Sequence, residues 1–219
     1  MIYIQRLKFN ISLLGDATVG KTCMVYSLKK FEFDENQIAT IGVDEVIDEA
    51  KFDNKLYKFK IFDTAGEERY KSIVGSTLQI SDAFLLVFSI NNRISFERIS
   101  FWIDTIRDKV NLNGKVLALV GNKIDLENER KVSHEEASNL AKKYQMKYFE
   151  TSAKTGFRIE ETFHSLYEDI YNLNKKLENQ VEDDDNAHKG SIKIQREDHI
   201  DNNNNNNKPI KKKKKSCFY

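Results

Sequence analysis

Cysteine, proline and long apolar runs are scarce in this sequence. Its 219 residues include 2 cysteines, Cys23 and Cys217, and 1 proline, Pro209. Two cysteines so far apart imply no framework of disulfide bonds. No apolar run approaches the ~18 residues that a membrane-spanning helix needs, and the start of the chain lacks the basic segment, apolar core and small-residue cleavage site of a signal peptide. We therefore expect a cytoplasmic protein.

The composition divides the chain into a body and a tail. Hydrophobic residues make up 40% of the whole, which is enough for one sizeable core. An acidic run, a run of asparagines and a run of lysines follow Lys176, at residues 182–185, 202–207 and 211–215. Residues 175–219 hold 11 Lys and Arg against 8 Asp and Glu, so the tail is basic and the body nearly neutral. We expect one globular domain over residues 1–177 and a disordered tail over residues 178–219.

Predicted strands and helices alternate along the body. Apolar or alternating runs predict strands over residues 7–14, 43–51, 56–62, 83–90, 116–120 and 146–149. Helical spacing predicts helices over residues 23–28, 96–110, 133–144 and 159–177. Ser133 and Glu136 are typical of a capping box, and the apolar stripe from Phe96 to Val110, Trp102 included, is interpreted as core packing. We expect an α/β fold with a mostly parallel six-stranded sheet, one antiparallel edge strand and about five flanking helices.

Residues 15–22 have the sequence Gly-Asp-Ala-Thr-Val-Gly-Lys-Thr and lie between a predicted strand and a predicted helix. This setting and this glycine spacing are typical of a phosphate-binding P-loop. Glycines at both ends let backbone N–H groups approach an anion, and the helix N-terminus adds positive potential. Lys21 would then reach the β- and γ-phosphates, and the Thr22 hydroxyl would bind Mg²⁺. A glycine-containing turn from strand to helix is the alternative interpretation.

Three more loops follow predicted strands. In Asp63-Thr64-Ala65-Gly66, the carboxylate could hold Mg²⁺ through water and the Gly66 amide could face a γ-phosphate. In Asn122-Lys123-Ile124-Asp125, the Asp125 carboxylate could accept N1–H and N2–H of guanine, a donor pair that adenine lacks. Backbone amides of Glu150-Thr151-Ser152-Ala153-Lys154 could meet the guanine O6. Because parallel strands end at one edge of a sheet, we expect the four loops to converge on one nucleotide.

Together these motifs resemble the Ras superfamily of small GTPases, and most of all a divergent Rab protein, over residues 7–177. Residues 40–44 are similar to the Rab form of switch I, and residues 63–70 to switch II. The resemblance implies that Thr40 coordinates Mg²⁺ and contacts the γ-phosphate in the GTP state, and that Phe33 lies against the guanine.

The resemblance also implies a full set of site residues. Those implied in catalysis are Lys21, Thr40, Gly66 and Glu67, and those implied for Mg²⁺ are Thr22, Thr40 and Asp63. Those implied for nucleotide binding are Gly15, Asp16, Ala17, Thr18, Val19, Gly20, Lys21, Thr22, Cys23, Phe33, Thr40, Asp63, Gly66, Asn122, Lys123, Asp125, Ser152, Ala153 and Lys154.

Two departures from the family bear on function. Glu67 stands where the family has a glutamine that orients the attacking water. A carboxylate can accept a proton but cannot donate an amide hydrogen bond, and its charge would face the γ-phosphate, so hydrolysis is in question. Rab proteins present three hydrophobic side chains to effectors at positions that are here Glu45, Phe62 and Thr77. We therefore expect partners unlike those of typical Rab proteins.

The tail ends with five lysines, at residues 211–215, close to Cys217. Each lysine could contribute about 1 kcal/mol at an anionic leaflet, and a prenyl chain on Cys217 would supply the second signal that stable anchoring needs. Cys217 is third from the end, whereas a C-a-a-X box requires the fourth place, although Rab proteins have varied cysteine endings. A solvated basic tail with an unmodified cysteine is the alternative. No aromatic interleaving or basic face in the body supports nucleic-acid binding.

The sequence thus predicts a monomeric Rab-like GTPase that alternates between GTP- and GDP-bound forms with Mg²⁺ and hydrolyses GTP slowly. We expect it to act in vesicle traffic at the cytoplasmic face of a membrane, with an exchange factor, an activating protein and effectors on its switch loops. Two alternatives stay open. One is a GTP-occupied, membrane-tethered scaffold in which Glu67 has removed useful turnover. The other is a P-loop nucleotide kinase, which residues 122–125 and the lack of a recognisable lid disfavour.

Overall fold

The computed structural model describes residues 6–33, 40, 42–65 and 71–194, and of residues 71–74 and 181–194 it describes the backbone alone. The chain divides into two compact units, Met1–Lys176 and Leu177–Tyr219. The motifs of the P-loop and of the three other loops all belong to the first unit.

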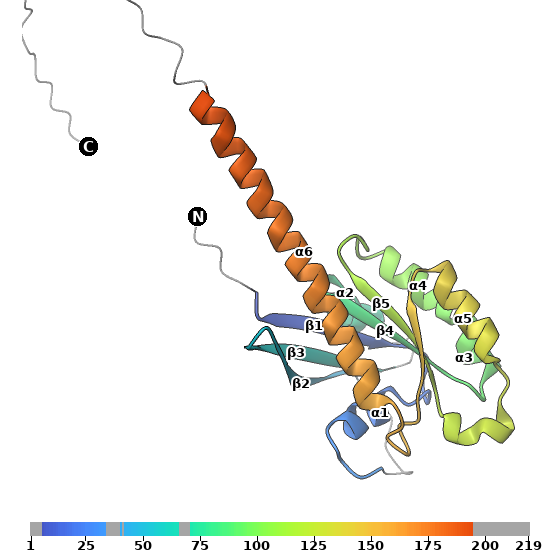
Figure 1. Cartoon of the computed structure of the whole chain (residues 1–219). Helices are drawn as coiled ribbons and strands as arrows, with labels where there is room; N and C mark the ends of the chain where they lie inside the picture. Colours follow the sequence, from blue (N-terminus) through green and yellow to red (C-terminus); the bar gives the residue numbers. More distant parts are fainter. Residues whose placement is uncertain (1–5, 34–39, 41, 66–70, 195–219) are drawn as a thin grey trace, which may run out of the picture. The chain divides into compact units, whose positions relative to one another are not determined.

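A six-stranded sheet forms the centre of the first unit, with the strand order β2-β3-β1-β4-β5-β6 (Figure 1). Its strands are β1 (Lys8–Leu14), β2 (Val43–Phe52), β3 (Lys55–Thr64), β4 (Ala83–Ser89), β5 (Val116–Asn122) and β6 (Lys147–Glu150). Among the described strands, β2 at the edge pairs antiparallel with β3, and all other neighbours are parallel. The predicted α/β sheet is therefore confirmed.

Helices cover both faces of this sheet (Figure 1). They are α1 (Lys21–Leu28), α2 (Lys71–Ile80), α3 (Arg93–Glu97), α4 (Ile99–Arg107), α5 (His134–Lys143) and α6 (Ile159–Ile194), with a 3-10 helix, η2 (Ile124–Glu129). Leu85 and Val87 of β4 pack in one core cluster with α1 and the first turns of α6. Phe84 and Leu86 pack in the second cluster with α2 to α5. Because β4 is buried on both faces, its sequence is continuously apolar.

Two of the predicted helices differ from the expectation. In place of one helix over residues 96–110, α3 and α4 meet at Arg98, whose φ of −77° and ψ of −4° depart from α-helical values. The last helix, α6, does not end at residue 177 but continues through Ile194, so residues 178–194, assigned to a disordered tail, are helical. A helix that has already formed extends without a new nucleation step, and the only proline of the sequence comes later, at Pro209. Residues 195–219, with Cys217 and the five lysines, lie outside the described residues.

The capping box at the start of α5 is confirmed. The Ser133 hydroxyl accepts from the Glu136 N–H at 3.2 Å, and the Ser133 N–H donates to Glu136 Oε2 at 3.1 Å. These bonds satisfy backbone donors that a helix start otherwise leaves without partners. The local sequence alone therefore determines where this helix begins.

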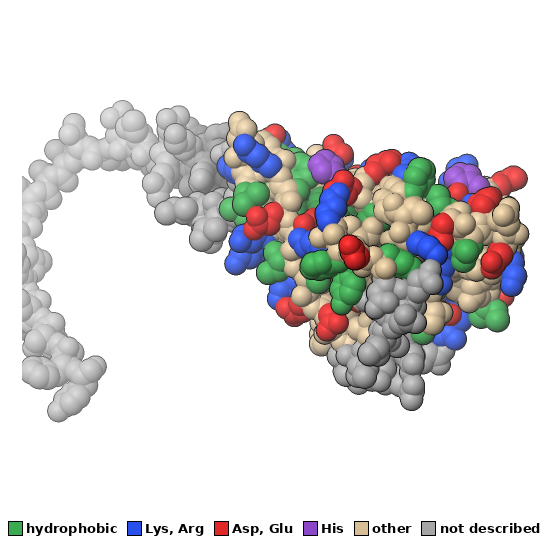
Figure 2. Space-filling model, turned by 90° about the horizontal axis from the view of Figure 1, so that it is seen from below, with side chains coloured by type: hydrophobic (Ala, Val, Ile, Leu, Met, Phe, Trp, Pro, Cys, Tyr) green, Lys and Arg blue, Asp and Glu red, His purple; other side chains and the backbone are tan. Residues whose placement is uncertain are grey.

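The surface of the described residues carries charges of both signs. On the face that Figure 2 shows, basic and acidic side chains are interspersed rather than gathered by sign. Within the described part of the chain, no helix combines the length and the apolar character needed to cross a membrane.

Candidate functional site

The loop between β1 and α1 contains two glycines that no other residue could replace. Gly15 has a φ of +146°, and a Cβ there would lie 2.1 Å from the Val87 carbonyl oxygen. Gly20 has a φ of +100°, and its Cβ would lie 2.4 Å from Asn122 Nδ2. Both contacts are far shorter than a real Cβ allows. The glycine spacing of the P-loop is thus required for the loop to pack against the ends of β4 and β5.

Lys21, the first residue of α1, turns its ammonium group into this loop. Its Nζ donates to the carbonyl oxygens of Gly15 and Asp16, both at 2.8 Å, and the side chain is 5% exposed. Burial lowers the pKa of Lys21 to about 8, although Asp63 and Asp16 act in the opposite direction. A buried ammonium beside a helix N-terminus and a ring of backbone amides is an arrangement that binds phosphate groups.

The hydroxyls of Thr22 and Thr40 meet the carboxylate of Asp63. Thr22 Oγ1 lies 2.7 Å from Thr40 Oγ1 and donates to Asp63 Oδ2 at 2.5 Å, and Thr40 Oγ1 lies 3.4 Å from the same oxygen. The other oxygen, Asp63 Oδ1, is buried and has no hydrogen-bond partner among the described residues. Burial raises the pKa of Asp63, against the hydrogen bond from Thr22 and the charge of Lys21.

This oxygen cluster fits a divalent cation. Hydroxyl and carboxylate oxygens are the ligands that Mg²⁺ prefers, and Mg²⁺ is bound through few protein groups together with phosphates and water. The partnerless Asp63 Oδ1 is an acceptor that a cation or its water could satisfy. The three residues that the sequence implies for Mg²⁺ are therefore close together in space.

The side chain of Asn122, at the end of β5, connects three of the loops. Its Nδ2 donates to the Val19 carbonyl of the P-loop at 2.9 Å. Its Oδ1 accepts from the Ala153 N–H at 3.1 Å and from Thr151 Oγ1 at 3.2 Å. With only 1% of Asn122 exposed, water cannot replace these partners, so the bonds fix the loops relative to one another.

Asp125 and Ser152 lie together on the outer side of that connection. Ser152 Oγ donates to Asp125 Oδ1 at 2.5 Å and accepts from the Thr155 N–H at 3.1 Å. Asp125 itself is exposed. Lys154 Nζ lies 5.9 Å from the centre of the Phe33 ring, which is 40% exposed. An exposed carboxylate and an exposed aromatic ring are both groups that can contact a flat, hydrogen-bonding ligand such as a nucleobase.

Not all of the sequence-predicted site can be placed. Gly66 and Glu67 lie outside the described residues, as does Ile41 of the switch I motif. Of the three positions at which Rab proteins present hydrophobic side chains, Glu45 is exposed and accepts from Lys60 Nζ at 2.7 Å. Phe62 and Thr77 are buried, with 2% and 8% exposure. Of these three side chains, Glu45 alone is exposed, and it is charged.

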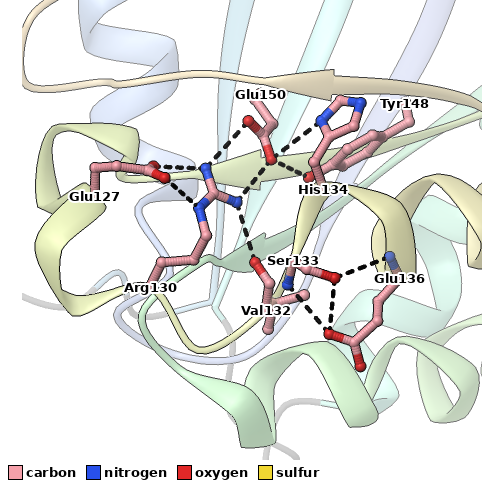
Figure 3. Close-up of polar contacts among 8 residues, drawn as sticks. All are labelled: Glu127, Arg130, Val132, Ser133, His134, Glu136, Tyr148 and Glu150. Atoms are coloured by element: carbon pink, nitrogen blue, oxygen red, sulfur yellow. Dashed lines mark hydrogen bonds and ion pairs between the residues drawn. The ribbon is translucent and has the colours of Figure 1, made fainter.

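A polar cluster around Arg130 was not anticipated from the sequence (Figure 3). Arg130 donates to both oxygens of Glu127 at 2.8 and 2.7 Å and to both oxygens of Glu150 at 2.8 and 3.2 Å. Tyr148 Oη also donates to Glu150, at 2.8 Å, and His134 Nδ1 lies 3.4 Å from it. Glu127 belongs to η2 and Glu150 ends β6, so Arg130 connects the segment after Asp125 to the loop that contains Ser152.

A second missed contact concerns Trp102, which the helical spacing assigned to the core. It is buried as expected, but its indole Nε1 also donates to Asp16 Oδ1 of the P-loop at 3.0 Å. Arg98 Nε lies 3.0 Å from the same oxygen. No local pattern could have indicated this pairing, since the partners are 86 residues apart in sequence.

Comparisons with known proteins find related sequences. The sequence model of the Ras family matches residues 10–172. Ras-related protein Rab-13 of Rattus norvegicus is 38% identical over 162 residues, which cover 74% of this chain and 79% of that protein. Ras-related protein Rab-8A of Bos taurus is 37% identical over 171 residues, covering 78% and 82%. Ras-related protein Rab-8B of Homo sapiens is 38% identical over 170 residues, covering 77% and 82%.

The Arg130 cluster predicts an acid-dependent loss of stability. Burial alone would raise the pKa of Glu150, but hydrogen bonds from Arg130 and Tyr148 hold that pKa below its ordinary value. A lowered pKa in the folded state stabilises the fold above the unfolded value of about 4.5, and this contribution is lost as the pH falls through the folded pKa. We expect Glu150→Gln to lower the free energy of unfolding at pH 7 by about 1–2 kcal/mol. The difference from the parent should persist down to about pH 4.5 and disappear only as the pH falls further, through the lowered pKa of Glu150.

Urea unfolding at several pH values between 3 and 7 tests this expectation. Glu168→Gln is the matched control, because Glu168 is exposed and surface charges contribute little. Parallel stability curves for the parent and Glu150→Gln across this range would contradict the assigned role of Glu150.

Proposed function

This chain belongs to the Ras family of small GTPases, and we propose that it binds GTP and GDP where the P-loop and the three other loops meet. The observation that carries this proposal is the connection made by Asn122 at the end of β5, which joins the P-loop after β1 to the Ser152 loop after β6. The family acts as a switch between GTP and GDP forms. A competition experiment with labelled GDP against GTP and ATP tests the proposal, and displacement by ATP would favour the nucleotide kinase alternative.

The P-loop and Lys21 would bind the phosphates. The loop's backbone N–H groups would donate to phosphate oxygens, and the Lys21 ammonium, now directed at the Gly15 and Asp16 carbonyls, would donate to the β- and γ-phosphates. Binding an anion would also remove part of the penalty for burying this ammonium, because an opposite charge favours its charged form. Cys23, which follows Thr22 in α1, would also contact the nucleotide.

Thr22 and Thr40 would hold Mg²⁺ directly, and Asp63 would hold it through water. When bound, the ion neutralises charge on the β- and γ-phosphates. The short contacts among the three side chains support this assignment. The Thr40 hydroxyl lies beside Thr22 and Asp63. In the GTP state, Mg²⁺ and the γ-phosphate would bind this hydroxyl and so hold Thr40 in place.

Asp125 would determine the choice of base. Its carboxylate accepts from Ser152 through Oδ1 and would accept N1–H and N2–H of guanine. Lys123 and the amides of Ala153 and Lys154 would complete the contacts of the base, with Phe33 against its ring. Adenine offers no donor pair for the same carboxylate, so ATP would bind poorly.

Asp125→Asn should reduce GTP affinity and increase affinity for xanthosine nucleotides. The Asp125 carboxylate can accept both guanine N–H groups, whereas the amide of asparagine is uncharged and has only one acceptor oxygen. Each charge-assisted hydrogen bond contributes ~1.5–3 kcal/mol. We therefore expect GTP binding to weaken by about two orders of magnitude. Equilibrium titration with fluorescent GDP and xanthosine diphosphate measures both changes, and Asp104→Asn, at an exposed aspartate of α4, is the control. Unchanged GTP affinity in Asp125→Asn would remove Asp125 from the site.

Hydrolysis by this chain would depend on Glu67 and Gly66. In the family, water attacks the γ-phosphate and the products are GDP and phosphate, with a glutamine orienting the water. We propose that Glu67 can hold the water but cannot donate to the γ-phosphate oxygens. An arginine from an activating protein could pair with the Glu67 carboxylate instead of the phosphate. Turnover would then be slow and its stimulation weak, and in the extreme the protein would act as a GTP-occupied scaffold.

Glu67→Gln should restore the response to activating proteins. Arginine-supplying activators raise turnover by ~10³–10⁵ in the family, and we expect the parent to respond far less than the variant. Nucleotide affinity should stay nearly the same, since this side chain does not hold the ground-state nucleotide. Single-turnover GTP hydrolysis with and without activator measures the difference, with Glu135→Gln as a charge-matched control. If the parent is stimulated as strongly as the variant, Glu67 is a tolerated substitution and the scaffold alternative fails.

The named relatives are Rab proteins, and from this similarity we propose a role in vesicle traffic on the cytoplasmic face of a membrane. The tail would attach the protein through its lysines, at residues 211–215, and a prenyl chain on Cys217. The two signals are complementary, because a single lipid chain gives only marginal binding and a polybasic segment adds to it. The GTPase domain would be a monomer, and exchange factors, activating proteins and effectors would bind to it.

Cys217→Ser should release the protein from membranes into the soluble fraction. Replacing the five lysines by glutamine should weaken or redirect attachment, since each lysine contributes about 1 kcal/mol near an anionic surface. Cell fractionation together with the intact mass of the membrane-bound protein measures both, and Ser216→Ala is the control. An unmodified Cys217 on membrane-bound protein would contradict the prenyl anchor.

A further inference from the structure

Two residues from outside the P-loop contact the side chain of Asp16, Trp102 through a hydrogen bond and Arg98 through an ion pair. Trp102 Nε1 donates to Asp16 Oδ1 at 3.0 Å, and Arg98 Nε lies 3.0 Å from the same oxygen. The backbone N–H of Trp102 donates to the backbone carbonyl of Arg98 at 3.1 Å, so the two residues are one helical turn apart and share a face. Trp102 is 2% exposed, and the Asp16 side chain is 17% exposed. The start of α4 therefore holds this carboxylate in a defined direction.

A carboxylate at this point is an electrostatic problem for the loop. The P-loop would bind a polyanion through its amides and Lys21, yet Asp16 adds a negative charge within the loop itself. Its carbonyl oxygen accepts from Lys21 Nζ at 2.8 Å, while its side chain points to α4. The Arg98 guanidinium compensates the charge, and the indole N–H of Trp102 fixes where the carboxylate lies.

We propose that Arg98 and Trp102 are positioning residues of the phosphate-binding loop, which retain bound nucleotide by holding the Asp16 carboxylate and compensating its charge. This inference rests on the proposed nucleotide site. It adds the start of α4 to the parts of the fold that set the lifetime of the bound state. The chemical class retained is a nucleoside di- or triphosphate, because the charge in question lies in the phosphate-binding loop.

A purely structural role for these residues makes a different prediction. If Arg98 only supported packing, its replacement would change stability and release rate in a way that does not depend on salt or on the charge of Asp16. If it compensates charge, Arg98→Gln leaves Asp16 to repel the phosphates, and that repulsion weakens as salt screens it. Removing the charge with Asp16→Asn in the Arg98→Gln background should then restore retention.

The experiment measures release of a fluorescent GDP analogue after addition of excess GDP. We expect Arg98→Gln to accelerate release about two- to tenfold at low salt, with the effect falling toward parity at ~1 M salt. Asp16→Asn added to Arg98→Gln should bring the rate back toward the parent value. Trp102→Phe keeps an aromatic ring but removes the donor, and should accelerate release at low and high salt alike.

Arg107→Gln is the matched control, because Arg107 is an exposed arginine of the same helix, 3.9 Å from Asp104. Release unchanged in Arg98→Gln would overturn the proposal, as would an acceleration that persists at high salt and is not rescued by Asp16→Asn. Failure of the parent protein to bind the GDP analogue would instead contradict the nucleotide site, and with it this inference. Melting temperatures of all variants separate loss of fold from loss of retention.

Discussion

The candidate site depends on the hydrogen bonds of the Asn122 side-chain amide. This amide is buried at the end of β5, and its two ends bind the P-loop carbonyl of Val19 and the Ala153 N–H of the loop after β6. Parallel strands bring the loops to one edge of the sheet, but they do not fix how the loops lie there. The buried amide does, because leaving its partners unsatisfied would cost ~1–3 kcal/mol for each group. Gly20 is required by the same contact, since a Cβ there would collide with Asn122 Nδ2.

The charged side chains of the candidate site are partly or fully buried, and burying a charge costs free energy. Lys21 and Asp63 are both buried, and burial moves the pKa of the lysine down and that of the aspartate up, each toward its neutral form. A site built to hold phosphate and a cation needs both groups charged, so ligand binding would supply the compensation that the protein alone provides incompletely. Asp16 adds a third charge, and the fold meets it with an arginine and an indole from α4. The stability of the fold and the affinity of the site are linked through these three residues.

The sequence allowed much of the fold and the main outline of the site to be predicted. The buried strands were recognisable because burial on both faces requires a continuous apolar run, as in residues 83–90, and the loops because their chemistry requires particular residues at fixed spacing. Contacts between side chains far apart in sequence were not recognisable: the pairing of Arg130 with Glu150 and of Trp102 with Asp16 depends on packing, which no local pattern specifies. The burial of Phe62 was hidden for the same reason. The length of α6 was missed because the polar composition of residues 178–194 is typical of disorder, whereas a helix that has already formed needs no new nucleation to continue.

The β2–β3 hairpin is held against the helices of the domain along its length. At one end of the hairpin, β2 begins at Val43, shortly after Thr40, and β3 ends at Thr64, next to Asp63. At its far end, Asp53 accepts from Tyr171 Oη at 2.5 Å and from Lys175 Nζ at 2.7 Å. Midway, Asp48 accepts from Tyr167 Oη at 3.0 Å and from Lys29 Nζ at 2.7 Å. These bonds, with the centres of the Phe59 and Tyr167 rings 4.0 Å apart, hold the hairpin against α6 and, through Lys29, against the end of α1. The body of the hairpin is therefore fixed by contacts remote from the Thr22, Thr40 and Asp63 side chains.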